Sequence, residues 1–155
     1  MFGQQEWQDM KVEDIIKDKG RSVSSVHPEM KLGEIARLLR DKRIGSVTVT
    51  NPKGQIIGLV TERAIVEAMA ESDACADTVS AAALMVSPAP AIESSADVYM
   101  AMRQMTNTRN RHLVVMDGQT VAGLISIGDL VKVRMRDMEL ENNVLRDIAR
   151  ANLSR

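Results

Sequence analysis

The sequence has a single cysteine, Cys75, and one residue each of Trp, Tyr and Phe among 155 residues. One thiol cannot form a disulfide within the chain, which fits a reducing compartment. Aromatic residues make up only 2% of the chain, so the hydrophobic core has to be aliphatic. Eleven methionines, which pack into irregular spaces, are available for that core.

Long apolar runs and blocks of like charge are missing as well. No apolar stretch approaches the roughly 20 residues that a membrane span needs, and residues 1–10 do not form a signal peptide. Twenty basic and 21 acidic residues give a formal net charge of -1, without a tail suited to a polyanion. We therefore expect a cytoplasmic protein that binds no membrane and does not have nucleic acid as its main partner.

The dominant feature of the sequence is an internal repeat at a spacing of about 65 residues. The stretch GLVTERAIV at 58–66 recurs as GLISIGDLV at 123–131. The alternating run VTVT at 47–50 recurs as LVVM at 113–116, and a turn signal follows each run. Each repeat is therefore predicted to contain a β-hairpin.

Segments with helical periodicity flank both hairpins. Apolar residues recur at helical spacing over 30–39 and over 98–105, and helices are also expected from Glu62 and from Ile127. Pro28 suits the first turn of one helix, and Ser94 with Asp97 suits a capping pair for another. Short strand-like pieces at 22–26 and 89–92 precede these two helices.

The predicted fold is of the α+β class, with tandem β-α-β-β-α repeats and a long C-terminal helix. Neither repeat can cover both faces of its small sheet, so we expect the sheets to pack on each other about a pseudo-twofold axis, with a cleft where the repeats meet. The predicted boundaries are an N-terminal extension at 1–11, a first repeat at 12–72, a connector at 73–83, a second repeat at 84–132 and a helical extension at 133–155.

The repeated pattern resembles the signature of CBS (cystathionine-β-synthase) domains, in which a glycine, two apolar residues and Thr or Ser follow a hairpin and precede an Asp. Two copies at this spacing, with RHLVV at 111–115 ahead of the second hairpin, carry the resemblance. It covers about 12–132 and looks closest to stand-alone two-domain proteins, known as Bateman modules.

The resemblance implies a regulatory sensor that is not an enzyme and that binds an adenosine nucleotide in the cleft between its repeats. AMP, ADP and ATP are the expected ligands, NAD(H) and S-adenosylmethionine are alternatives, and no cofactor is obligatory. CBS pairs also imply a homodimer and an unidentified regulated protein. The implied ligand-binding residues are Asp129 and Ser126 for the ribose, Arg111 and His112 for phosphate, Ile44, Gly45 and Leu124 for the adenine, and Thr61 as the counterpart of Ser126.

The chemistry of Asp129 agrees with this assignment. One carboxylate can accept hydrogen bonds from both ribose hydroxyls, and the start of a helix favours its ionised form. Ser126 and Asp129 also fit an ordinary capping box, which stays open as an alternative or additional role. With only His27 and His112 in the chain, no metal-ligand cluster is evident.

The first repeat departs from the pattern, because Ala64 stands where the motif Asp is expected. Its cleft is then empty or used differently. This substitution motivates an alternative function, a ligand-independent adaptor that binds a protein or a nucleic acid.

The C-terminal stretch from Asp129 to Leu153 has the pattern of a long amphipathic helix. Its apolar side needs to be covered by its own module or by a second chain, which again favours a homodimer. That side carries Val131, Met135, Met138, Leu145 and Ile148.

Overall fold

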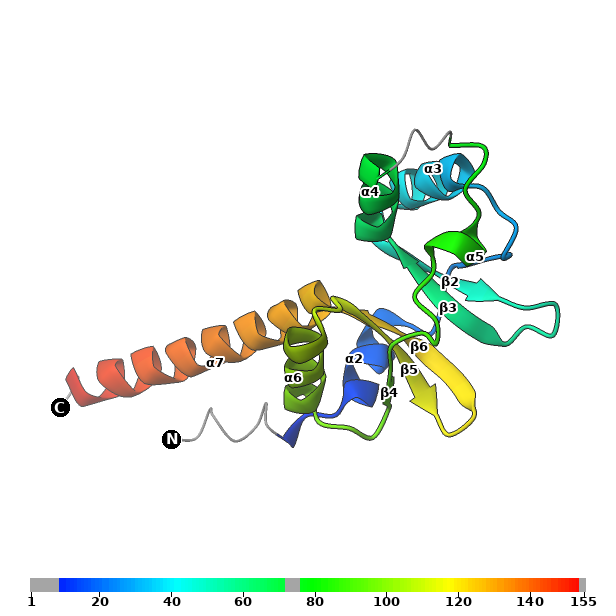
Figure 1. Ribbon diagram of the computed structural model, residues 1–155. Coiled ribbons are helices and arrows are strands. Elements are labelled where there is room, and N and C mark those ends of the chain that lie inside the picture. The colour runs from blue at the N-terminus through cyan, green and yellow to red at the C-terminus, as the bar shows by residue number, and fades with distance from the viewer. Residues whose placement is uncertain (1–8, 72–75, 154–155) are drawn as a thin grey trace. The chain divides into compact units, whose positions relative to one another are not determined.

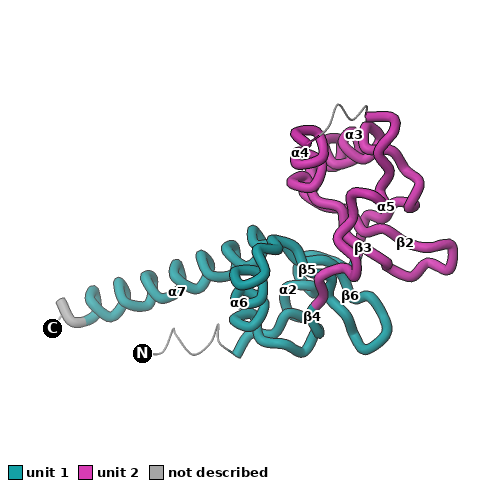
Figure 2. Tube along the Cα trace, viewed as in Figure 1, with its two compact units in different colours: residues 1–21, 92–155 teal, residues 22–91 magenta. Residues whose placement is uncertain are grey.

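The computed structural model describes residues 9–71 and 76–153, so Cys75 lies outside the described residues. The fold is mixed α+β, with two three-stranded sheets ordered β1-β2-β3 and β4-β5-β6 (Figure 1). The chain divides into two compact units (Figure 2). Unit 1 combines residues 1–21 with 92–155, and unit 2 contains residues 22–91.

Unit 2 is built on the first hairpin. Strand β1 (Ser25–Val26) pairs in parallel with β2 (Ser46–Thr50), which pairs antiparallel with β3 (Ile56–Thr61). The helices of the unit are α3 (Leu32–Lys42), α4 (Glu62–Glu71) and α5 (Ala81–Leu84). Its core is aliphatic and includes Val26, Leu32, Ile35, Leu39, Val47, Val49, Val60, Ile65, Ala81 and Leu84.

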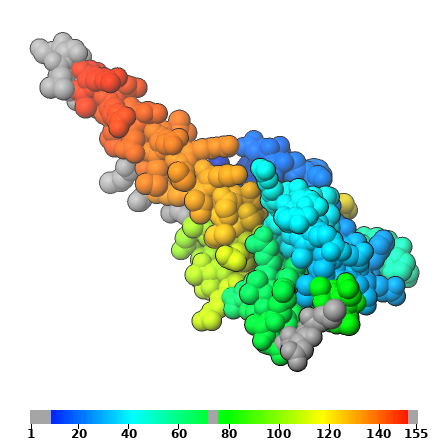
Figure 3. All heavy atoms as spheres, turned by 90° about the horizontal axis from the view of Figure 1, so that it is seen from above, coloured from blue at the N-terminus to red at the C-terminus, as the bar shows by residue number. Residues whose placement is uncertain are grey.

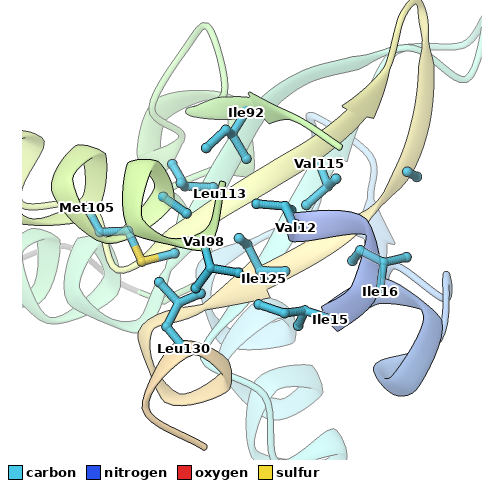
Figure 4. Close-up of a cluster of buried hydrophobic side chains, with 12 residues drawn as sticks. Val12, Ile15, Ile16, Ile92, Val98, Met105, Leu113, Val115, Ile125 and Leu130 are labelled. Carbon is cyan, nitrogen blue, oxygen red and sulfur yellow. The ribbon is translucent and has the colours of Figure 1, made fainter. Parts of the chain in front are cut away.

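Unit 1 is built on the second hairpin, in which β5 (His112–Asp117) pairs antiparallel with β6 (Thr120–Ser126), and β4 (Ala91–Glu93) lies beside β5. Its helices are α2 (Val12–Lys19), α6 (Val98–Thr108) and α7 (Ile127–Leu153). The core residues converge from all of these elements (Figure 4): Val12, Ile15, Ile16, Ile92, Val98, Ala101, Met105, Leu113, Val115, Ala122, Ile125 and Leu130. Over the described ranges, no helix has the length and apolarity to cross a membrane.

The helix near the start of each repeat packs against the hairpin of the other repeat, α2 against β6 and α5 against β3. In unit 1, the Val12 N–H at the start of α2 donates to Ala96 O at 2.9 Å. In unit 2, the Ala81 N–H at the start of α5 donates to Met30 O at 2.8 Å in the same way. The compact units therefore differ from the continuous stretches that the repeat marks in the sequence.

Two glycines allow α2 and the end of α5 to approach their sheets. A Cβ at Gly123 would lie 2.6 Å from Ile16 Cδ1, and one at Gly58 would lie 2.5 Å from Met85 Sδ. Both distances are far shorter than a van der Waals contact. The first residue of the repeated motif is therefore a glycine because a neighbouring side chain occupies the space of its side chain.

The predicted first-turn role of Pro28 and the predicted capping pair of Ser94 and Asp97 are wrong, although α6 begins at Val98, where the helical spacing places it. Helix α3 begins at Leu32, so Pro28 lies before it, and the Pro28 carbonyl accepts a hydrogen bond from the Ala82 N–H at 2.9 Å. Asp97 is the N-cap residue of α6 but makes no side-chain capping bond, because its carboxylate is bound by Lys11 Nζ. Ser94 does not cap α6 either; its N–H donates to the Met116 carbonyl of β5.

Candidate functional site

The candidate site begins where β6 ends and α7 starts. Ser126 is the last residue of β6, and Asp129 lies in the first turn of α7. The Ser126 N–H donates to Asp129 Oδ2 at 2.8 Å, and the Asp129 N–H donates to Ser126 Oγ at 3.3 Å. This reciprocal pair is a capping box. Capping is thus one role of both residues, and it is compatible with a second role.

A lysine from the N-terminal helix also binds this carboxylate. Lys19, the last residue of α2, donates from Nζ to Asp129 Oδ2 at 2.7 Å and to the Leu124 carbonyl oxygen at 2.9 Å. The Asp129 side chain is only 14% exposed, whereas that of Lys19 is 40% exposed. The lysine is therefore the better solvated partner of this ion pair.

The Asp129 carboxylate is ionised at neutral pH. Burial by itself raises the pKa of Asp129, but the hydrogen bonds from Lys19 and Ser126, together with the Lys19 charge, outweigh burial and hold that pKa below its ordinary value. The site consequently presents a half-buried negative charge that is a strong acceptor for hydroxyl groups.

The two carboxylate oxygens of Asp129 differ in their surroundings. Oδ2 accepts from Lys19 Nζ, from the Ser126 N–H and from Ser126 Oγ, the last at 3.0 Å. Among the described residues, none donates to Oδ1. A carboxylate has about four acceptor positions in all. New donors can therefore bind Oδ1 directly, whereas a donor that needs Oδ2 has to displace one of its three present partners.

The other predicted residues of the second repeat lie around the start of α7. The Arg111 carbonyl accepts the Ile127 N–H at 2.9 Å, while the Arg111 side chain is exposed. His112 lies opposite Ser126 in the β5–β6 register. Leu124 lies on the same face of β6 as Ser126, because alternate residues of a strand share a face. The structure thus brings Arg111, His112, Leu124, Ser126 and Asp129 together.

The three predicted residues of the first repeat form an equivalent set in unit 2. The Gly45 carbonyl accepts the Glu62 N–H at 3.1 Å, as Arg111 accepts that of Ile127. Ile44 is partly buried against the unit 2 core. Thr61 Oγ1 accepts the Ala64 N–H at 3.3 Å, so the helix cap is present without a carboxylate.

Lys19 is the residue of the site that sequence reasoning missed. A lysine in the last turn of a helix is common because it interacts favourably with the helix dipole, so Lys19 gave no distinctive signal. Its partner Asp129 lies 110 residues further along the chain. Over residues 9–71 and 76–153, no group of three or more His, Cys, Asp or Glu side chains is arranged to hold a metal ion.

Known proteins share this architecture. A CBS-domain containing protein of Agrobacterium tumefaciens has 35% sequence identity and a TM-score of 0.78, over 82% of this chain and 95% of that one. A CBS domain protein of Pyrobaculum aerophilum, solved in complex with AMP, has 26% identity and a TM-score of 0.67, over 77% and 89% of the two chains.

Curated relatives are longer than the stretch they share with this chain. An uncharacterized protein of Methanopyrus kandleri is 31% identical over 114 residues, which are 73% of this chain and 58% of that protein. The family model of the CBS domain matches residues 12–71 and 80–136, and these two stretches contain the two hairpins predicted from the sequence. The chain therefore belongs to the CBS-domain family.

Proposed function

We propose that this protein is a regulatory sensor that binds an adenosine nucleotide, AMP, ADP or ATP, through Asp129. The observation that carries the proposal is a half-buried, ionised carboxylate whose Oδ1 atom accepts no hydrogen bond from the described residues. The AMP complex of the Pyrobaculum aerophilum protein supports the same ligand class.

The proposed contacts follow from the chemistry of each ligand group. The two ribose hydroxyls donate to the two oxygens of Asp129, in charge-assisted hydrogen bonds. The exposed Arg111 side chain, with His112, binds phosphate, and Leu124 packs against the adenine. In unit 2, Ile44 and Gly45 as adenine contacts and Thr61 as a ligand contact remain predictions from the family resemblance.

The proposal has further parts that concern the whole protein. We propose that it acts in the cytoplasm as a homodimer without an obligatory cofactor, catalyses no reaction and changes the activity of a regulated protein when it binds its ligand.

A thermal-shift screen of AMP, ADP, ATP, NADH, S-adenosylmethionine and GTP identifies the ligand. A nucleotide at about 100 times its dissociation constant adds roughly 2.7 kcal/mol to the free energy of unfolding. No shift with any adenosine compound would instead favour the adaptor function.

Calorimetric titration of Asp129→Ala tests the site itself. The variant loses a hydrogen bond to a charged group worth about 1.5–3 kcal/mol, so its affinity should fall by roughly 10 to 150 times. Arg111→Ala should weaken AMP and ATP more than adenosine, because its proposed partner is phosphate. Asp147→Ala, which removes an exposed carboxylate further along α7, is the matched control and should bind like the wild type.

The expected stoichiometry is one tight site per chain, because only the second repeat has the motif carboxylate. Two equal sites, or an Asp129→Ala variant that binds like the wild type, would show that Asp129 does not bind the ribose.

A further inference from the structure

The C-terminal part of α7 carries an uncovered apolar surface. The helix has 27 residues, and beyond its first turns it extends past the other described residues of unit 1, as the orange and red spheres show on the visible face (Figure 3). Four of its apolar side chains, Val131, Met135, Met138 and Leu145, are about half exposed or more.

These residues form one continuous line along the helix. Together with Asn142 and Ala149 they recur at alternating spacings of four and three residues, which are the a and d positions of a heptad repeat. We call the line Val131, Met135, Met138, Asn142, Leu145 and Ala149 the α7 stripe. Leu130, which α7 buries in its own unit, is 1% exposed. Val131 follows it at about 100° around the helix, so the stripe is turned away from the unit 1 core.

We propose that the α7 stripe pairs in register with the stripe of a second copy of this chain, forming a parallel two-stranded coiled coil. In this heptad frame, d positions are Val131, Met138 and Leu145, and a positions are Met135, Asn142 and Ala149. Apolar residues at five of the six positions supply the hydrophobic seam that such a pair requires.

The charges beside the stripe favour this partner. In a parallel pair, each g residue faces the e residue five positions later on the other helix. Arg134, whose Nη1 lies 3.9 Å from Glu141 Oε1 of its own chain, then also faces Glu139 of the partner subunit, and Glu141 faces Arg146 of the partner subunit. Both pairs are opposite in charge, and the twofold symmetry repeats each of them. Complementary charges at e and g are the feature that selects partner and orientation in coiled coils.

Asn142 distinguishes a parallel from an antiparallel pair. In a parallel, in-register pair it lies opposite Asn142 of the partner subunit, where the two amides can bond to each other. In an antiparallel pair an a residue faces a d residue, so Asn142 would face Met138 or Leu145 and its amide would be buried without a partner. A single Asn at an a position is a known determinant of register in parallel dimers.

Analytical ultracentrifugation of the 155-residue chain and two Glu variants tests the surface. Leu145 is a d residue that is 64% exposed, whereas Leu140 lies on the opposite side of α7 and is 61% exposed. Leu145→Glu should raise the dimer dissociation constant at least tenfold, and Leu140→Glu should change it less than twofold. Far-UV circular dichroism verifies that both variants keep the wild-type helix content. A wild-type chain that sediments at 17.1 kDa as a monomer, or equal effects of the two variants, would overturn the proposal.

Disulfide cross-linking tests the orientation, with Cys75 replaced by Ser. Ala149→Cys should form a covalent dimer on oxidation, because a parallel pair places the two thiols side by side. In an antiparallel pair that places Asn142 opposite Leu145 or Met138, the same positions would be about 16 or about 27 Å apart. Leu140→Cys is the control and should not cross-link. If Leu140→Cys cross-links as fast as Ala149→Cys, or if Ala149→Cys stays monomeric, the parallel pair is wrong. None of these measurements involves a nucleotide, so their outcome is independent of the proposed ligand site.

Discussion

Replacing Lys19 by Met removes the ammonium group that occupies the candidate site. In the wild type, Nζ binds both Asp129 Oδ2 and the Leu124 carbonyl oxygen. A ribose that uses both carboxylate oxygens has to displace a donor from Oδ2, and Lys19 is the displaceable one because its side chain is 40% exposed. Met keeps the length of the aliphatic part of the side chain and removes the charge.

The size of the effect follows from the exposure of the ion pair. A hydrogen bond to a charged group contributes about 1.5–3 kcal/mol, and solvent around the lysine reduces this to about 1 kcal/mol. Lys19→Met should therefore lower the free energy of unfolding by about 1 kcal/mol, which is a decrease of about 2–4 °C in Tm. A ligand that no longer has to break the contact gains the same free energy, so its affinity should rise about fivefold.

Adenosine is the probe for this measurement, because it has the ribose hydroxyls and lacks a phosphate that the lysine charge would attract. Calorimetric titration compares the wild type, Lys19→Met and the control Lys17→Met. Lys17 lies on the same helix but, among the described residues, pairs only with Glu13 and Asp14, so its replacement should leave binding unchanged. Weaker binding to Lys19→Met would mean that Lys19 is a ligand contact, and unchanged binding would mean that the ligand does not need Oδ2. Either result would refute the prediction that the ribose displaces Lys19 from Asp129 Oδ2.

Three further predictions concern stability. Because the folded-state pKa of Asp129 is lowered, its ionised form stabilises the fold fully above the unfolded pKa of about 3.9, and this contribution is lost as the pH falls through the folded value. The difference in urea-unfolding free energy between the wild type and Asp129→Asn should then be constant from about pH 5 to 8 and shrink below about pH 4; a change between pH 5 and 8 contradicts this. Gly58→Ala should cost about 1–3 kcal/mol by overpacking, because the added Cβ lies within 2.9 Å of Met85 Cβ as well as Sδ. Gly123→Ala closely approaches only Ile16 Cδ1, so adding Ile16→Val should recover part of its loss in calorimetric Tm, and no recovery would show that the backbone has shifted.

The hairpins could be predicted from the sequence because their signals are local. Strand alternation and the turn residues at 51–54 and 117–118 lie within a few residues of one another, and both hairpins form where they were expected. The backbone bonds that hold the starts of α3 and α6 could not be predicted in this way. They link these starts to the residues just before α5 and α2, such as Leu32 N–H to Val79 O and Val98 N–H to Met10 O.

In the candidate site, too, the local contact could be predicted from the sequence and the long-range contact could not. The contact between Ser126 and Asp129 spans three residues and has a sequence pattern of its own, whereas the contact with Lys19 spans 110 residues and has none.

The methionines show a similar limit of prediction from hydrophobic spacing. Met105 is buried, yet Met135 and Met138 are exposed on α7, because hydrophobic spacing alone does not distinguish a core from an uncovered surface.

A comparison of the two repeats bears on why Asp129 is a carboxylate. Both repeats have the same scaffold: a carbonyl before the hairpin accepts the first N–H of the following helix, and a hydroxyl at Thr61 or Ser126 caps that helix. In unit 2 this scaffold forms with Ala64 at the third helical position, so the fold does not require an acid there. Burial of the Asp129 side chain opposes its ionisation, and Lys19 offsets that cost. A charge that the scaffold can do without, held ionised in a half-buried position, is the arrangement expected of a residue that binds a ligand.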